Sequence, residues 1–378
     1  MRRVLLAAVS VFFTITAYSE SNLPFEVKEI ASFDEPWALA FLPDGNILVT
    51  EMKGSLFIVT QDGDKSRPIS GVPDVDYGGQ GGFGDVILHP DFVNNQTIYL
   101  SYVEAGNDNT RGAAVARAVL NVTDRGGYLS NIEVIWRQYP KMVGRGHYGH
   151  RLLFDQDGYL WISSGDRQKF TPAQDMQSNL GKILRLNEDG SVPEDNPFVD
   201  YRNQDALVDD VGVYQQIWSL GHRNPLGIAF DVDGQLWNIE MGPAGGDELN
   251  RVLRGANYGY PIVSNGDHYD GREIPDHDTR PEFNEPAAWW TPVISPGYLA
   301  LYDGELFSAW HGDLLVAGLS SEAIIRIEID GNQAKEAERF PMGARIRSVV
   351  QGPNDALWVL EDETSQSKGR LLKLIPNP

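Results

Sequence analysis

Residues 153–166 read LFDQDGYLWISSGD, an apolar pair followed by an Asp-Gly step and a short run of alternating apolar residues. Glycine tolerates a positive φ in a tight hairpin turn, and the alternation predicts a half-buried strand after that turn. The same phrase recurs at 40–51 (AFLPDGNILVTE), 229–242 (AFDVDGQLWNIEMG) and 350–362 (VQGPNDALWVLED), with weaker copies at 88–102 (LHPDFVNNQTIYLSY) and 310–319 (WHGDLLVAGL). The chain therefore carries six copies of one turn-and-strand unit.

A further strand follows most of the copies, so each repeat is predicted to be a sheet of several strands; these segments are 55–60, 182–187, 248–253, 323–329 and 369–374. Strand-rich repeats without long amphipathic helices favour radially arranged blades over a sandwich. We predict an all-β, six-bladed β-propeller of four-stranded antiparallel sheets, forming a single domain over residues 20–378. Two separate β domains are the alternative, although no Pro/Gly/Ser-rich linker divides the chain. The polar inserts at roughly 104–150, 190–215 and 260–300 are expected to form loops on one face.

The N-terminus has the features of a secretory signal peptide, predicted for residues 1–19. Arg2 and Arg3 precede an apolar stretch from Val4 to Ile15, and Ala17-Tyr18-Ser19 supplies small residues before Glu20. That stretch is shorter than the roughly 20 residues that span a bilayer, so we predict no membrane span and a periplasmic or secreted protein. Because the chain has no cysteine, a large core rather than disulfides must stabilise it.

The charge balance is strongly acidic. The chain has 31 Lys and Arg against 53 Asp and Glu, a formal net charge of -22. This balance predicts that nucleic acid is not a partner. A surplus of carboxylates is compatible with calcium sites, although charge alone indicates only solubility.

Two polar clusters contain candidates for general acid-base chemistry. The glycine run 78–82 lets the backbone approach a ligand closely, and Gln80 within it offers one donor and one acceptor. The segment 146–151 contains His147 and His150, which compete for the role of general base, and Asp166 could orient such a histidine. A flexible turn and structural histidines are the alternative interpretation.

Two further clusters suit an anion and a metal ion. In 220–225, Arg223 could pair with an anionic ligand and Asn224 could hydrogen-bond beside it, or the pair could only tie loops together. The segment 241–261 combines a Gly-Pro turn with carboxylates, a set of hard oxygens that suits calcium rather than zinc. No serine stands in a Gly-x-Ser-x-Gly elbow, and the zinc-protease, Walker and nicotinamide-binding phrases are missing, so those enzyme classes have no support.

Taken together, the clusters resemble the soluble aldose sugar dehydrogenases that depend on pyrroloquinoline quinone (PQQ), the soluble glucose dehydrogenase or glucose/sorbosone dehydrogenase family. The resemblance runs from about Pro36 to Leu374. It rests on these phrases in order: GGQGG-x7-PDF, H-x-x-x-R-L from His147, GKILRLNEDGSVPEDNPF, LGHRNP-x-G, GP-x-x-x-DE-x-N, NYG-x-P and RIR at 345–347.

This resemblance implies a six-bladed propeller that oxidises the anomeric hydroxyl of an aldose to a lactone by hydride transfer to PQQ. His147 resembles the general base, Asp166 its supporting carboxylate, and Arg223 a residue that also stabilises charge on the quinone oxygen. The remaining correspondences are cofactor contacts at Gln80, Asn224, Tyr269, Arg345 and Arg347, ligands of the cofactor's calcium at Gly242 and Pro243, and a second, structural calcium at Glu248 and Tyr258.

The chain departs from the family pattern twice. Ser320 stands where the family commonly has a lysine against the cofactor, and His150 stands where it usually has glycine. These departures favour an alternative function, a non-catalytic propeller that binds a ligand or glycan. A calcium-dependent lactone hydrolase is a third interpretation, but it leaves the arginines of 345–347 without a role. The expected partners are a sugar and an external electron acceptor, and the chain could be a monomer or a homodimer.

Overall fold

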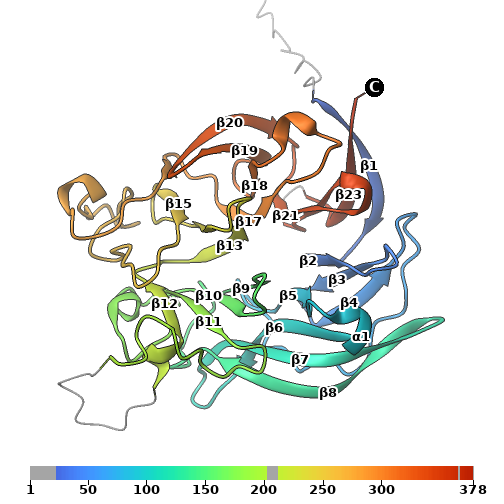
Figure 1. The fold of residues 1–378 in the computed structure, drawn as a ribbon, viewed down its shortest axis with the longest axis horizontal. Helices are drawn as coiled ribbons and strands as arrows, with labels where there is room; N and C mark the ends of the chain where they lie inside the picture. Colours follow the sequence, from blue (N-terminus) through green and yellow to red (C-terminus); the bar gives the residue numbers. More distant parts are fainter. Residues whose placement is uncertain (1–22, 202–211, 365–366, 378) are drawn as a thin grey trace, which may run out of the picture.

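The computed structural model describes residues 23–201, 212–364 and 367–377, and these form six antiparallel sheets around one axis (Figure 1). This confirms the predicted six-bladed β-propeller. From the innermost strand outward, the sheets are β2 (Pro36–Phe41), β3 (Ile47–Glu51) and β4 (Ser55–Val59); β5 (Phe83–Leu88), β6 (Thr97–Ala105), β7 (Arg111–Thr123) and β8 (Gly126–Arg137); β9 (Gly149–Phe154), β10 (Leu160–Ser164), β11 (Lys182–Leu186) and β12 (Ile217–Leu220); β13 (Pro225–Phe230), β14 (Leu236–Glu240), β15 (Asp247–Arg251) and β16 (Ala288–Trp290); β17 (Pro296–Leu301), β18 (Leu314–Gly318), β19 (Ala323–Asp330) and β20 (Gln333–Pro341); and β21 (Ile346–Gln351), β22 (Leu357–Glu361), β23 (Arg370–Pro376) and β1 (Phe25–Ser32).

Helical structure within the described residues is limited to single turns. The short helix α1 (Phe92–Asn95) links β5 to β6, and the 3-10 turns are Thr171–Gln174, Val213–Gln216, His277–Thr279, Ser308–Trp310 and Pro353–Asp355. No helix in the described part of the chain is long and apolar enough to cross a membrane. The predicted signal peptide and the domain boundary at residue 20 lie outside the described residues.

The ring is closed by strands from the two ends of the chain. The N-terminal strand β1 pairs antiparallel with β23, so that Phe25 lies opposite Pro376. In Figure 1 the blue β1 accordingly lies beside the red C-terminal strands. The six innermost strands also contact one another in sequence around the axis, from β2 through β5, β9, β13 and β17 to β21 and back to β2. Pairing the two ends in one sheet removes the open edge that a linear array of sheets would leave.

One blade is smaller than predicted. Five sheets have four strands, whereas β2, β3 and β4 form a sheet of three. At its outer edge, Lys65 makes a single bridge to Val59 of β4. The segment after β4 therefore holds the position of a fourth strand without forming one.

The repeated sequence phrase corresponds to the end of an innermost strand, a turn and the second strand. In two of the copies the turns share the same side-chain hydrogen bonds. Asp155 accepts the indole N–H of Trp161 at 2.8 Å and the backbone N–H of Tyr159. Asp231 accepts the indole N–H of Trp237 at the same distance. The first Asp of the phrase thus caps the turn, while Gly158 in the first copy adopts φ 86°, which only glycine reaches easily.

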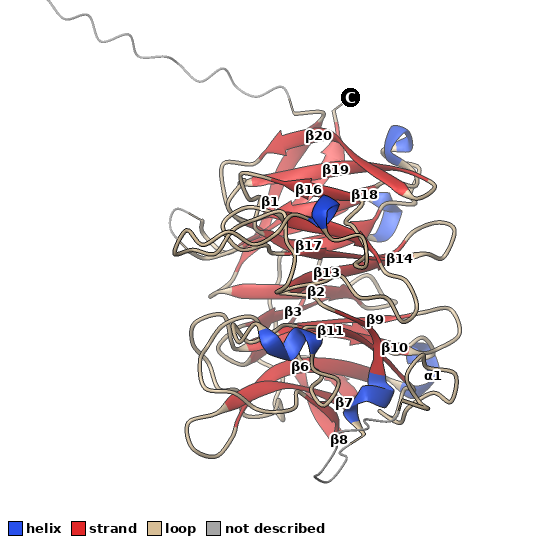
Figure 2. Cartoon of the chain, turned by 90° about the vertical axis from the view of Figure 1, so that its left-hand side faces the viewer, coloured by secondary structure: helices blue, strands red, loops and turns tan. Residues whose placement is uncertain are grey.

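The prediction that the polar inserts form loops on one face was wrong for 104–150. That range contains all of β7 and β8, which pair along nearly their whole length. β8 lies at the rim of the propeller (Figure 2), and its mixture of exposed polar and apolar residues resembles a loop, whereas β7 is largely apolar and buried. Within the described part of the insert at 190–215, Asp195 lines a cavity together with the repeated Asp-Gly turns.

The apolar core lies between the blades. One cluster joins Trp237 and Leu249 of one blade to Leu314 and Val316 of the next, and all four side chains are fully buried. Equivalent clusters fill the other spaces between blades. Truncating such a leucine to alanine typically costs about 2–5 kcal/mol, so packing between the sheets can stabilise a chain that has no disulfide.

Candidate functional site

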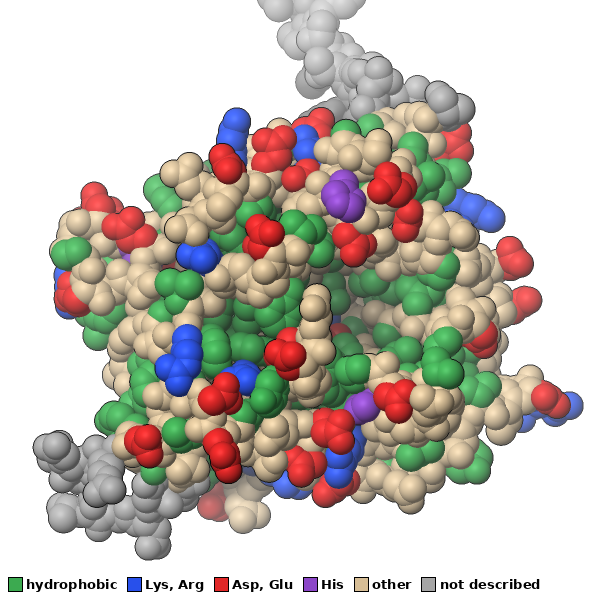
Figure 3. All heavy atoms as spheres, in the orientation of Figure 1, with side chains coloured by type: hydrophobic (Ala, Val, Ile, Leu, Met, Phe, Trp, Pro, Cys, Tyr) green, Lys and Arg blue, Asp and Glu red, His purple; other side chains and the backbone are tan. Residues whose placement is uncertain are grey.

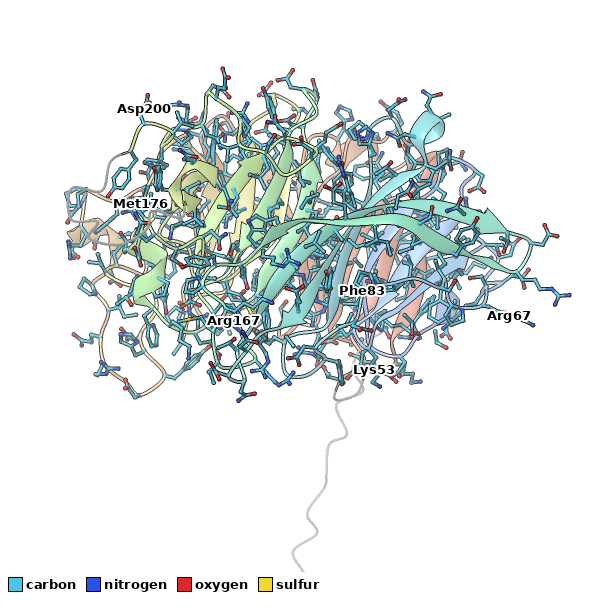
Figure 4. All side chains as sticks on the ribbon, turned by 90° about the horizontal axis from the view of Figure 1, so that it is seen from below. Lys53, Arg67, Phe83, Arg167, Met176 and Asp200 are labelled. Carbon is cyan, nitrogen blue, oxygen red and sulfur yellow. The ribbon has the colours of Figure 1, made fainter. Side chains whose placement is uncertain are left out.

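The sheet topology divides the chain's connections between two faces. The loops that enter each innermost strand, and those that link the second strand to the third, lie on one face; the repeated Asp-Gly turns lie on the other. Most of the predicted site residues occupy connections of the first kind. Figure 4 shows Arg167 and Lys53, from two such loops, on the lower side of the molecule, and Asp200 on the opposite side. We call the first side the site face.

His147 and Asp166 form a buried pair on the site face. The Nδ1 atom of His147 lies 2.6 Å from Oδ1 of Asp166, and neither side chain is more than 5% exposed. His147 precedes β9 and Asp166 follows β10, so the pairing of these two neighbouring strands brings the residues together. Because a carboxylate oxygen only accepts, Nδ1 carries the proton, and Nε2 of a neutral imidazole is left as an acceptor.

The Asp166 carboxylate is held in place by the backbone around it. It accepts the N–H groups of Gln168 at 2.9 Å and Phe170 at 3.2 Å. Burial lowers the pKa of His147 below its usual value, and Asp166 partly opposes that shift. His147 is therefore neutral near pH 7 and able to accept a proton.

Arg223 and Asn224 enter the site from the loop before β13. The Nη1 atom of Arg223 donates to the carbonyl oxygens of Met241, at 3.0 Å, and Gly242. Its Nε atom is buried and has no hydrogen-bond partner among the described residues. The Oδ1 atom of Asn224 accepts the N–H of Gly149 at 3.2 Å, which ties this loop to the start of β9.

Arg345 and Arg347 share one carboxylate. Each donates to Oδ2 of Asp362 at 3.1 Å, Arg345 through Nε and Arg347 through Nη2. Burial acts to raise the pKa of Asp362, but the two arginines outweigh it and the pKa is lowered, so this carboxylate is charged. The Nε atom of Arg347 is buried without a partner in the described chain. The sequence analysis missed Asp362, although it ends the repeated phrase at 350–362, one position earlier in the repeat than Asp166 in its own copy.

Two cavities open beside these groups. One, of about 230 Å³, is lined by His147, Arg223, Pro243 and Tyr269 among others. The second, of about 210 Å³, is lined by residues that include Gln80, His150, Asn224, Arg345 and Arg347. Gln80 connects them, because its Oε1 accepts the backbone N–H of His147 at 2.7 Å. Apart from Gly242, Glu248 and Tyr258, the predicted site residues thus line these cavities or, like Asp166, support a residue that does.

His150 does not resemble a general base in its surroundings. The residue is 2% exposed, and its ring is stacked on Trp37 with centroids 4.8 Å apart. Its Nδ1 atom lies 2.8 Å from the hydroxyl of Ser101. Burial, followed by the charge of Arg151, lowers the pKa of His150 to about 3, so the ring stays neutral across the physiological range. Of the two competing histidines, His147 alone is paired with a carboxylate.

The segment that carries Gly242 and Pro243 presents backbone carbonyls. The Asp247 carboxylate beside them is already used, since it accepts the N–H groups of Gly242 at 2.8 Å, Ile294 at 2.8 Å and Ser295 at 2.7 Å. Within the described ranges there is no group of three or more His, Cys, Asp or Glu side chains placed to hold a metal ion. Calcium takes six to eight oxygens, so these two carbonyls could hold it only together with further oxygens from a ligand or water.

Glu248 and Tyr258 have protein partners of their own. Oε1 of Glu248 lies 3.2 Å from Nε2 of His277, and its Oε2 accepts Asn250 at 3.3 Å. The hydroxyl of Tyr258 donates to the carbonyl of Arg251 and accepts the N–H of Leu253 at 3.0 Å. A calcium ion at Glu248 would have to compete with the His277 imidazole, so the side chains fit a metal poorly here.

Ser320 is not among the residues that line either cavity. Its side chain is exposed and donates to the carbonyl of Val293 at 3.2 Å, and Leu319 is the nearest residue in the chain that lines the second cavity. The substitution that separates this chain from the family's lysine pattern therefore leaves the arginine pair unobstructed.

A larger cavity lies on the opposite face. It has a volume of about 800 Å³ and is lined by the Asp-Gly turns of two blades and by Trp161, Trp218 and Tyr298. Figure 3 looks onto this face, where hydrophobic side chains line a hollow near the axis. The fully buried Arg151, between the rings of Trp37 and Tyr298, separates this cavity from those of the site face. By volume alone, this cavity would be the candidate functional site. The buried histidine-carboxylate pair and the unpartnered arginine atoms instead indicate the site face.

Comparison with known proteins covers almost the whole chain. Residues 33–373 match the family described as Glucose / Sorbosone dehydrogenase. The aldose sugar dehydrogenase YliI of Escherichia coli is 38% identical over 351 residues, which cover 91% of this chain and 90% of the relative.

Two solved structures have the same architecture. The apo form of the soluble aldose sugar dehydrogenase of Escherichia coli superposes with a TM-score of 0.85 at 37% identity, covering 93% of this chain and all of that one. The PQQ-bound form of an aldose sugar dehydrogenase from Streptomyces coelicolor superposes with a TM-score of 0.76 at 28% identity, covering 93% of this chain and 98% of that one.

Proposed function

Because this chain belongs to the glucose/sorbosone dehydrogenase family and is therefore a sugar dehydrogenase, we propose that it oxidises the anomeric hydroxyl of aldoses to lactones with PQQ as its cofactor. The observation that carries the proposal is the buried His147–Asp166 pair in a wall of the cavity that Arg223 also lines. A neutral base and a fixed cation in one cavity suit a reaction that removes a proton and develops negative charge.

The site suits an anionic cofactor. PQQ carries three carboxylates and two quinone oxygens, and buried guanidinium atoms of Arg223 and Arg347 still lack acceptors. Leaving a buried charged donor unpaired is costly, so a carboxylate or carbonyl oxygen placed there would be stabilised. Gln80 and Asn224 add amide groups in the cavity that Arg347 lines. We assign Gln80, Arg223, Asn224, Tyr269, Arg345 and Arg347 to cofactor binding.

PQQ, when bound, supplies the electron acceptor to which the sugar's hydride is transferred. The chain's own part is to position the sugar and to accept its proton. Nε2 of His147 takes the hydroxyl proton, while Asp166 holds Nδ1–H and stabilises the imidazolium that forms. Arg223, whose guanidinium is fixed by the carbonyl of Met241, stabilises negative charge beside the base.

We further propose that a calcium ion joins the cofactor at the carbonyl oxygens of Gly242 and Pro243. The tightness of the Gly242 turn favours this assignment, since a Cβ at Gly242 would lie 2.2 Å from the carbonyl oxygen of Gly246. Arg223 would have to release the Gly242 oxygen as the metal binds. The structural calcium at Glu248 and Tyr258 stays a prediction, and no step of the reaction depends on it.

The proposal is tested by adding PQQ and calcium to the purified apo-protein and measuring cofactor absorbance, then dye reduction with a panel of aldoses. We expect saturable binding and sugar-dependent reduction. His147→Ala should abolish turnover and leave PQQ binding largely intact. A matched control is His89→Ala, which breaks another histidine-carboxylate pair, 2.7 Å from Glu188, away from the site cavities. A fully active His147→Ala variant would refute the assigned base, and no PQQ binding would favour a propeller that only binds a ligand or glycan.

A further inference from the structure

His150 lines the same cavity as Arg345 and Arg347, yet the reaction described above gives it no role. One face of its ring is covered by Trp37, and its Nδ1 side is closed by Ser101. Gly84 makes this placement possible, because a Cβ there would lie 2.0 Å from Cε1 of the imidazole. The ring is therefore held in one orientation by three neighbours.

The hydrogen bonds of Ser101 determine which nitrogen of His150 carries the proton. The Ser101 hydroxyl accepts the backbone N–H of Asp85 at 2.7 Å. Its own proton is buried, and Nδ1 of His150 at 2.8 Å is the acceptor that the described residues offer it. Buried hydroxyl protons are almost always donated, so Nδ1 accepts and the neutral ring carries its proton on Nε2.

The Nε2 atom of His150 has no hydrogen-bond partner among the described residues, and it is not one of the atoms sealed from solvent. Since Trp37, Ser101 and Gly84 close the other sides of the ring, this atom faces the cavity. We propose that His150 is a binding residue for PQQ that donates a hydrogen bond from its neutral Nε2–H to an oxygen of the cofactor. The inference rests on the proposed function and deepens it.

His147 and His150 then have opposite tautomers and opposite roles. His147 is protonated on Nδ1 by its contact with Asp166 and accepts at Nε2, whereas His150 accepts at Nδ1 and donates at Nε2. A neutral N–H donor orients a bound oxygen atom without adding a third positive charge beside Arg345 and Arg347.

Two substitutions distinguish the acceptor role of Nδ1 from the donor role of Nε2. His150→Asn keeps an acceptor near the position of Nδ1 and removes the donor at Nε2, whereas His150→Gln keeps a donor near Nε2. Asparagine also tolerates the φ of 60° at this position. We expect PQQ affinity, measured by calorimetry on the apo-protein with calcium present, to fall about tenfold in His150→Asn and to be largely kept in His150→Gln.

The tautomer can be measured without the cofactor. Long-range proton-nitrogen NMR of the histidine rings separates the two neutral forms, and the signal lost in His150→Asn identifies residue 150. We expect a protonated Nε2 and an unprotonated Nδ1 in the apo-protein.

An Nδ1–H tautomer, or equal PQQ affinity in wild type and His150→Asn, would overturn the inference about His150 alone. A wild-type protein that binds no PQQ would overturn it together with the proposed function. The two failures are therefore distinguishable, even if one variant folds poorly.

Discussion

The burial of His150 predicts a specific loss of stability in acid. Its pKa is lowered from 6.5 to about 3, mainly by burial and then by the charges of Arg151, Arg167 and Arg347. In the unfolded chain an imidazole has a pKa of about 6.5, so between pH 6.5 and 3 the unfolded state binds a proton that the folded state does not. Stability contributed by this group is complete above pH 6.5 and is lost progressively as the pH falls toward 3.

The magnitude follows from the pH interval. At pH 4.5, two units below the unfolded pKa, the linkage amounts to about 3 kcal/mol. The assay is urea unfolding at pH 7.5 and pH 4.5 for wild type and for His150→Asn, which cannot titrate. We expect wild type to lose about 3 kcal/mol more than the variant between the two pH values. Other carboxyl groups titrate in this range, but they are common to both proteins and cancel in the difference.

Equal losses in the two proteins, within about 1 kcal/mol, would refute the reasoning. That result would mean that the ring is protonated in the folded state, or that water reaches it freely. It would also remove the neutral donor from the cofactor cavity, so this experiment bears on the PQQ contact as well.

Four further outcomes are expected. Asp166→Asn should lower kcat by about 100-fold or more while PQQ affinity changes little, because the base loses the partner that orients it; Asp231→Asn, a buried turn carboxylate near the opposite face, should leave kcat unchanged. Arg347→Ala should weaken PQQ binding by about 10- to 100-fold in calorimetry, and an unchanged affinity would contradict its role. Since burial lowers the pKa of His147, kcat/KM should remain level below pH 6.5 and decline only at lower pH; a decline centred above pH 6.5 would count against this base. Calcium should bind the Gly242 and Pro243 carbonyls weakly in the apo-protein and tightly only with PQQ present, and calorimetric calcium binding that PQQ does not strengthen would contradict this assignment.

Much of the fold was predictable because the repeated phrase is a local signal. Its Asp residue caps the turn and its glycine adopts a positive φ, both within a few residues of chain. The outer strand β8 was not recognised, because its many exposed residues at the rim of the propeller give it the mixed composition of a loop. β7 is largely apolar and buried, but it lies within the same insert. The sequence also did not predict that the sheet of β2, β3 and β4 has only three strands. The segment after β4 makes a single bridge at Lys65, and no sequence pattern distinguishes such a bridge from a full strand.

The site was predictable as a set of residues but not as an arrangement. The sequence analysis left His147 and His150 as competing partners of Asp166, and the structure places His147 against Asp166 across the hairpin of β9 and β10. Asp362 was missed, although it holds both Arg345 and Arg347. The opposite tautomers of the two histidines depend on Ser101 and Asp166, which come from different blades or loops. A single sequence contains no signal for such contacts.

The sequence by itself determined the number of blades, the position of each turn and the residue types that carry the chemistry, because these follow from short-range patterns of hydrophobicity and backbone preference. Only the tertiary structure decided which histidine is paired with a carboxylate, which arginine atoms lack acceptors and which cavity they face. Those properties arise when strands distant in the chain meet around one axis. Burial and hydrogen bonding there then determine the protonation of each group.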